Sequence, residues 1–158
     1  LLDLLTPIAK SYPSEMCCLT TGAAVQILGG AGYTTDFPVE QYYREARIHP
    51  IHEGTTGIHG LDLLGRKLTL HGGKGMQYLR EEILATIEAA KASAAEDLEK
   101  MAGDLETALR QVQQVTASLL PLALQDKELF LADGTVFLDF FGIVVIGWQW
   151  RREVTQAQ

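Results

Sequence analysis

The residues best suited to chemistry lie between Ile48 and Gly57, in the string Ile-His-Pro-Ile-His-Glu-Gly-Thr-Thr-Gly. Within it, Glu53 follows a largely apolar run and precedes a glycine and the expected start of a helix. If this bend is packed, the carboxylate is poorly solvated, which makes it a stronger proton acceptor and suits it to general base catalysis. The alternative is structural, because the helix dipole favours a Glu in a first helical turn. The spacing alone leaves both interpretations open.

Histidines surround this glutamate and raise the question of a metal site. His49, His52 and His59 are separated by 3 and 7 residues, across Pro50 and a bend. They therefore share no single helical face, and no His-Glu-x-x-His string occurs. We expect these histidines to be partly exposed and to bind no metal.

Glycine-rich strings suggest nucleotide binding but lack its context. Leu28–Tyr33 does not have the GxGxxG spacing, and it follows a helix rather than a strand. His71–Gly75 resembles half of a phosphate-binding loop, but no Ser or Thr follows Lys74, so we expect a helix-to-helix turn. Gly54–Gly57 opens a helix, whose first N–H groups can hold an anion or a polar ligand.

The elements that position these residues are predicted to be helices. After a short helix-like stretch over 1–8 and a turn at Tyr12–Glu15, apolar residues at helical spacing predict helices over 14–28 and 39–48. Another restarts at Thr55 or Thr56 and ends at Gly72-Gly73.

The second half carries a longer helical pattern. From Met76 to Val112 the apolar residues recur every 3.6 residues or so, and charged residues occupy the opposite face. We expect a break at Ser93–Asp97 or at Gly103, and a last helix that holds Phe130 to Trp148. The fold class is all-α, a helical bundle. We divide it into a first segment, 1–72, and a helical extension packed on it, 73–158.

Composition excludes several classes of function. The net charge is −7, which argues against broad binding to nucleic acid or to anionic membranes. The most apolar stretch, 136–150, contains Asp139 and Gln149 and is too short to span a membrane. Cys17 and Cys18 are adjacent and cannot form a disulfide framework, which favours a reducing, cytoplasmic location. Because the chain opens without Met or a basic leader, we expect it to be the tail of a longer protein.

The stretch from Ala24 to Leu68, AVQILGGAGYTTDFPVEQYYREARIHPIHEGTTGIHGLDLLGRKL, resembles the C-terminal signature of the acyl-CoA dehydrogenases. The family pattern runs Gln, then Gly-Gly-x-Gly-aromatic, then an acidic residue with Pro-Val-Glu, then Arg-Asp/Glu-Ala-Arg/Lys, then Glu-Gly-Thr. All parts are present in that order. EGTTGIHGLDLLGRK and the later FLDFFGIVVIGWQW resemble a larger subgroup with an extra C-terminal helical region, whose members include the methylthiopropanoyl-CoA dehydrogenases.

The resemblance implies a reaction, in which an acyl-CoA thioester is oxidised to a trans-2-enoyl-CoA. A carboxylate removes the α-proton while a hydride leaves the β-carbon for the flavin of FAD. The family's catalytic base is the Glu of Glu-Gly-Thr, which corresponds here to Glu53. Its backbone N–H binds the thioester carbonyl, so the resemblance assigns substrate binding to Glu53 and Gly54.

The same resemblance assigns cofactor binding to four residues. Gln26, Gly29 and Gly30 correspond to the segment that touches the ADP part of FAD bound in a neighbouring subunit. Thr55 corresponds to a Thr beside the flavin or its pyrophosphate. The chain departs from the family at His52, where a Tyr is usual, and at His59, where a Gln is common.

The family's N-terminal helical domain and middle β-domain are absent from these residues. We therefore expect the chain alone to be inactive, to lose FAD and to associate with itself. The expected partners are an acyl-CoA substrate, an electron-transfer acceptor protein and further copies in a dimer or tetramer. The alternative is a non-catalytic helical assembly module derived from the family, in which Glu53 is idle.

Overall fold

The computed structural model describes residues 1–93 and 96–156, which are almost entirely helical and contain no strand. This confirms the all-α fold class. The helices are α1 (Leu2–Leu28), α2 (Gly30–Tyr33), α3 (Val39–Ala46), α4 (Thr56–Asp62), α5 (Lys74–Ala92), α6 (Glu96–Leu119), α7 (Leu122–Gln125), α8 (Lys127–Ala132) and α9 (Gly134–Gln156). A π-helical turn, Leu63–Lys67, and a 3-10 turn, Leu70–Gly73, connect α4 to α5.

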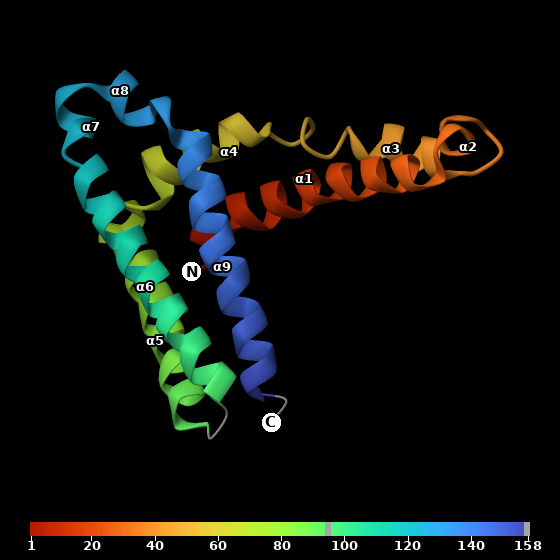
Figure 1. The fold of residues 1–158 in the computed structure, drawn as a ribbon. Helices are drawn as coiled ribbons and strands as arrows, with labels where there is room; N and C mark the ends of the chain where they lie inside the picture. The colour runs from red at the N-terminus through yellow and green to blue at the C-terminus, as the bar shows by residue number, and fades with distance from the viewer. Residues whose placement is uncertain (94–95, 157–158) are drawn as a thin grey trace.

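The hydrophobic core lies where α5, α6 and α9 pack as a bundle and the first turns of α1 close one end (Figure 1). Trp148 of α9 is fully buried there, and its indole Nε1 donates a hydrogen bond of 2.9 Å to Oγ1 of Thr86 on α5. Leu4 and Ile8 anchor α1 in the same core, together with Leu63 of the π-helical turn. This bundle is the rigid support for the rest of the chain.

The remainder of α1 leaves the bundle as an arm, along which α3 lies and at whose tip α2 sits (Figure 1). We call the part of the chain from Leu19 to Ile51 the arm. Val39 and Ala46 of α3 are buried within it, but many large apolar side chains of the arm are exposed. The exposed ones include Leu19, Ile27, Leu28, Tyr33, Tyr42, Ile48 and Ile51. The arm thus presents an apolar surface that no other described part of the chain covers.

The predicted turn at Tyr12–Glu15 is wrong, because α1 continues through Pro7 and Pro13. A proline in a helix removes one backbone hydrogen bond and crowds the preceding turn. Here the Oγ of Ser14 donates to the carbonyl oxygen of Lys10 at 2.6 Å, and that of Ser11 donates to Pro7 at 2.7 Å. The buried residues of α1, from Leu4 to Ser11, fix its first turns in the core, and α3 packs along its later turns, so the helix continues across both prolines.

Other predicted boundaries shift by a few residues. The helix predicted over 39–48 ends at Ala46, and the one predicted to reach Gly72-Gly73 ends at Asp62 and passes into the π-helical turn. The break predicted near Ser93–Asp97 is found, since α5 ends at Ala92 and α6 begins at Glu96; residues 94–95 lie outside the described residues. Helix α6 runs through Gly103 without a break.

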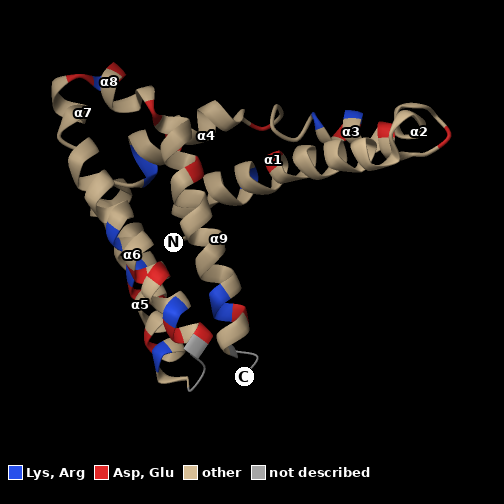
Figure 2. Cartoon of the chain, viewed as in Figure 1, with Lys and Arg blue, Asp and Glu red and all other residues tan. Residues whose placement is uncertain are grey.

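Charged residues of both signs are interspersed along α5 and α6 (Figure 2). One ion pair joins the two helices, with Lys91 Nζ 2.7 Å from Glu106 Oε2. No helix within the described residues is long and apolar enough to cross a membrane.

Candidate functional site

Glu53 lies in the loop between α3 and α4, and its backbone is left-handed, with φ of 55°. Gly54 follows with φ of 97°, a conformation that favours glycine. A left-handed glutamate costs free energy and is found mainly where the surrounding structure imposes it. The Glu53 side chain is exposed, as is that of Ile51, so the described residues do not desolvate the carboxylate. A packed bend, the condition for a poorly solvated carboxylate, is therefore not met within the described residues.

Thr55 ends the loop and caps α4. Its backbone is extended, and its Oγ1 accepts a hydrogen bond of 3.4 Å from the N–H of Ile58. The next residue, Thr56, donates its hydroxyl to Oε1 of Glu15 on α1 at 2.5 Å. Glu53, Gly54 and Thr55 are thus contiguous and held at the junction of the arm with α4.

Side chains from α1 hold this loop, and the sequence patterns did not reveal them. The Nζ of Lys10 donates hydrogen bonds of 2.7 Å to the carbonyl oxygens of His49 and Gly54. Further along α1, the thiol of Cys18 donates to the carbonyl oxygen of Ala46 at 3.3 Å. Lys10 is 39 and 44 residues from its partners, so no local spacing could have indicated these contacts.

The histidines near Glu53 do not converge on a common point. The rings of His49 and His52 meet edge to face, with centroids 5.6 Å apart. His59 instead lies against Gly54, where a Cβ would stand 3.1 Å from its Nε2. That nitrogen is buried and has no hydrogen-bond partner among the described residues. Within the same residues, no group of three or more His, Cys, Asp or Glu side chains could hold a metal ion.

The residues assigned to the ADP part of FAD lie elsewhere. Gln26 is exposed near the end of α1, and Gly29, with φ of 59°, ends this helix by donating its N–H to the carbonyl oxygen of Gln26 at 3.2 Å. Gly30 begins α2 at the tip of the arm (Figure 1). The structure therefore groups Gln26, Gly29 and Gly30 at the tip but separates them from Glu53 and Thr55.

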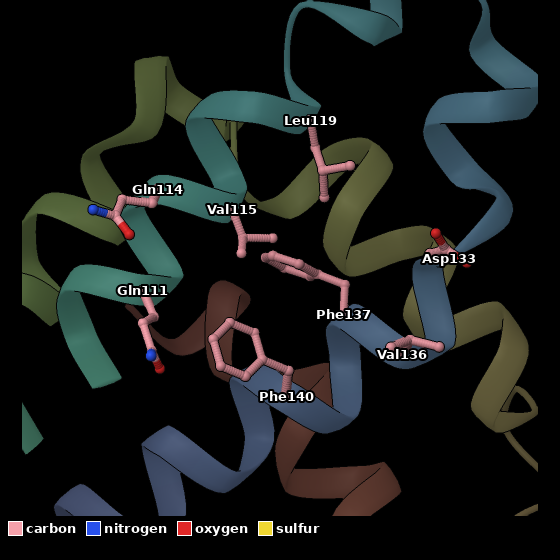
Figure 3. Close-up of a pocket in the computed structure, with 8 residues that line it drawn as sticks. All are labelled: Gln111, Gln114, Val115, Leu119, Asp133, Val136, Phe137 and Phe140. Atoms are coloured by element: carbon pink, nitrogen blue, oxygen red, sulfur yellow. The ribbon is translucent and has the colours of Figure 1, made fainter. Parts of the chain in front are cut away.

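Two cavities lie outside the predicted site. One, of about 470 Å³, lies beside Thr56, where Glu15, Met16 and Leu19 of α1 face Ile143 of α9. The other, of about 600 Å³, lies between α6 and α9, where Phe137 and Phe140 face Val115 and Leu119 (Figure 3). The lining of the second includes none of the residues assigned to catalysis or to cofactor binding.

The all-α fold and the Glu-Gly-Thr loop at the start of α4 are the features expected of an acyl-CoA dehydrogenase C-terminal domain. Comparisons with known proteins identify the same family. Residues 3–69 match the family described as acyl-CoA dehydrogenase, C-terminal domain, and residues 79–158 match that described as acetyl-CoA dehydrogenase C-terminal like. The chain belongs to the acyl-CoA dehydrogenase family.

Relatives match along nearly the whole chain. The 3-methylmercaptopropionyl-CoA dehydrogenase of Ruegeria pomeroyi is 37% identical over 93% of this chain and 25% of its own length. The broad-specificity linear acyl-CoA dehydrogenase FadE5 of Mycobacterium tuberculosis is 32% identical over 98% of this chain and 26% of its own. The chain thus spans about a quarter of the length of these relatives.

A solved structure, described as Bd2924 apo-form, shares the fold. It aligns with a TM-score of 0.66 and 24% identity, over 97% of this chain and 25% of the other. At that identity the likeness is evidence for the helical architecture alone.

Proposed function

We propose that this chain is the part of an FAD-dependent acyl-CoA dehydrogenase that supplies the catalytic base, Glu53, for the oxidation of acyl-CoA to trans-2-enoyl-CoA. The observation that carries this proposal is the conformation of the Glu53 loop. An exposed glutamate has a left-handed conformation beside a left-handed glycine, and Lys10 of α1 donates hydrogen bonds to the carbonyl oxygens of His49 and Gly54 in the same loop. Local backbone strain of this kind is concentrated at functional sites.

The proposed chemistry at Glu53 is proton abstraction from the α-carbon of the thioester. The carboxylate takes the proton as the C–H bond breaks, and a positioned base of this kind contributes roughly 10²–10⁴-fold to a rate. The backbone N–H of Glu53 points, in this proposal, to the thioester carbonyl, where it would stabilise the negative charge that develops. Gly54 completes the proposed substrate contact, and its missing side chain leaves room for His59, whose Nε2 would stand 3.1 Å from a Cβ there.

FAD, when bound, would supply the acceptor for the hydride that leaves the β-carbon. The residues assigned to it fit such a group. A Cβ built on Gly29 or on Gly30 would meet nothing within 4 Å, so the backbone at the arm tip is open to a ligand. Gln26 is an exposed residue there, and Thr55 is an exposed residue next to the proposed base. The arm tip and Thr55 lie apart in the structure, which is consistent with a cofactor that two subunits contact.

A second candidate function, assembly, is favoured by the exposed apolar side chains of the arm. Ile27 and Tyr33 are 83% and 85% exposed, which is unusual for residues of this size unless another surface covers them. We infer that the arm contacts other parts of the enzyme or further copies in a dimer or tetramer. In the purely structural version of this proposal, Glu53 has no role in the reaction.

The proposed partners are therefore an acyl-CoA, an electron-transfer acceptor protein and other copies of the enzyme. On its own, the 158-residue chain is expected to bind FAD weakly and to be inactive. A purified chain that retains yellow flavin through gel filtration, and that bleaches with an acyl-CoA, would contradict that expectation.

The experiment that tests the function uses the full-length protein that contains this chain, purified with FAD. Acyl-CoAs of different chain length are mixed with it, and flavin bleaching is followed by stopped flow. Glu53→Gln is expected to keep the flavin and to lose bleaching by a factor of about 10² or more. Glu88→Gln, an exposed position on α5, is the matched control and should bleach at the wild-type rate. Equal bleaching by Glu53→Gln and wild type would favour the assembly function.

A further inference from the structure

We propose that Lys10 is a positioning residue for Glu53, whose ammonium group holds the loop that carries the base in its left-handed conformation. This inference rests on the proposed function of Glu53. It adds a residue from α1, outside the Ala24–Leu68 signature, to the machinery of the site.

The contacts of Lys10 are specific to the two ends of this loop. Its Nζ lies 2.7 Å from the carbonyl oxygen of His49 and 2.7 Å from that of Gly54. These carbonyls flank residues 50–53, so the ammonium group of Lys10 bridges the two ends of the loop. We call this pair of hydrogen bonds the Lys10 clasp. Hydrogen bonds from a charged donor are stronger than those between neutral groups, and the interaction with two acceptors fixes the distance between them.

Lys10 is well placed for this role because its helix is rigid at that point. Its neighbours Ile8 and Ser11 are each 2% exposed and pack in the core of the bundle. The backbone of Lys10 is therefore fixed relative to the bundle, and its side chain transfers that position to the loop. Glu15, on the same helix, holds Thr56 just beyond the loop.

The loop needs such a support, since its own hydrogen bonds are local. The N–H groups of Ile51 and His52 both donate to the carbonyl oxygen of Ile48, at 3.0 Å. Among the described residues, the side-chain hydrogen bonds to the backbone of residues 49–54 come from Lys10. Because positive φ at Glu53 is unfavourable, loss of the two Lys10 hydrogen bonds should let the backbone of Glu53 relax. The carboxylate would then leave its position for proton abstraction.

The test compares Lys10→Met with Lys67→Met in the full-length protein with FAD bound. Lys67 is another lysine that contacts α1, itself 8% exposed, but it pairs with Asp3, at 3.3 Å, rather than with the loop. Lys10→Arg is the conservative variant, since its guanidinium can still donate to two carbonyls. We measure hydrogen–deuterium exchange of peptides covering 48–56, the rate of flavin bleaching, and the dissociation constant of the enoyl-CoA product.

Lys10→Met should accelerate exchange in 48–56 and not in the α5–α6 core. A misplacement of about 1 Å can cost roughly 10²-fold in rate, so bleaching should slow by that order while product affinity changes far less. Lys10→Arg should recover part of the rate, and Lys67→Met should leave both the loop exchange and the rate near wild type.

Unchanged exchange in Lys10→Met, or equal loss of rate in Lys67→Met, would overturn the proposal. The exchange measurement does not depend on activity, so it decides the clasp even if the wild-type protein fails to bleach with any acyl-CoA. A wild-type protein that does not bleach with any acyl-CoA would reject the proposed function and not the structural role of Lys10. Loosened exchange with an unchanged bleaching rate would reject Lys10 as a positioning residue.

Discussion

Gly60 of α4 and Gly134 at the start of α9 lie in backbone contact. A Cβ built on Gly60 would stand 2.6 Å from the carbonyl oxygen of Gly134 and 2.8 Å from the N of Thr135. The contact joins two parts of the chain with different tasks, because α4 begins directly after the Glu53 loop and α9 is the last helix of the bundle. Helix α9 of the C-terminal half therefore packs against α4, the helix that follows the proposed base.

Gly60→Ala should destabilise the chain strongly. The added methyl group meets backbone atoms that cannot rotate away, so α4 must move from α9, at a cost of about 3 kcal/mol in the free energy of unfolding. Gly57→Ala on the same helix is the matched control, since a Cβ there would meet only Thr55 Oγ1, at 3.8 Å. It should be neutral or stabilising by about 1 kcal/mol. Urea unfolding of both variants measures the difference, and equal midpoints would contradict the contact.

The buried hydrogen bond between Trp148 and Thr86 makes a second prediction. Thr86→Val keeps the shape of the side chain but leaves the indole N–H without an acceptor, which should lower the free energy of unfolding by about 1–3 kcal/mol. Thr107→Val, at an exposed position of α6, changes the same atoms without this loss. Thermal unfolding of the pair tests the prediction, and similar midpoints would show that the indole finds another partner.

Much of the fold could be predicted from the sequence because apolar periodicity reports directly on buried helical faces. The pattern from Met76 to Val112 predicted the buried faces of α5 and α6, and the unusual length of a single helix over that range predicted the break between them. The course of α1 through Pro13 could not be predicted, since proline usually ends a helix and the compensation comes from tertiary packing, in the core at the first turns and against α3 at the later ones. The π-helical turn after α4 likewise depends on tertiary contacts, in which Leu63 and Leu64 reach the core.

The site was predicted unevenly for a similar reason. Glu53, Gly54 and Thr55 could be proposed because they form a contiguous motif, and their roles stay predictions. Lys10 could not be proposed from the sequence, because its partners are 39 and 44 residues away and a lone lysine carries no sequence signal. The separation of Gln26, Gly29 and Gly30 from Glu53 reflects the straight course of α1, which no motif reports.

Because the backbone of Glu53 is left-handed, we predict that this residue lowers the stability of the fold while it serves the proposed reaction. Glu53→Gly should remove the steric penalty and raise the free energy of unfolding by roughly 0.5–1 kcal/mol, after the extra entropy of glycine in the unfolded chain is subtracted. Glu53→Gln keeps a similar side chain and the penalty, so its stability should equal that of wild type. Both should lack the proposed base. Denaturant unfolding of the three proteins provides the test, and a Glu53→Gly variant less stable than Glu53→Gln would show that φ of 55° carries no strain.

The ion pair between Lys91 and Glu106 predicts a dependence of stability on pH. The hydrogen bond from Lys91, and then its positive charge, lower the pKa of the Glu106 carboxyl below its ordinary value. A carboxyl whose pKa is lower in the folded state stabilises the protein above its unfolded pKa, about 4.3, and loses that contribution as the pH falls through the folded value. Glu106→Gln should therefore melt slightly below wild type at neutral pH, and the gap should close on acidification.

Because the side chains of Lys91 and Glu106 are 46% and 42% exposed to solvent, the gap in melting temperature should be small and should also close with added salt. Glu99→Gln is the matched control, since within residues 1–93 and 96–156 no ion pair is formed by this exposed side chain of α6. Calorimetry of wild type and both variants, from neutral pH to below pH 4, measures the effect. A gap for Glu106→Gln that stays constant or widens in acid would mean that the carboxylate does not stabilise the contact between α5 and α6.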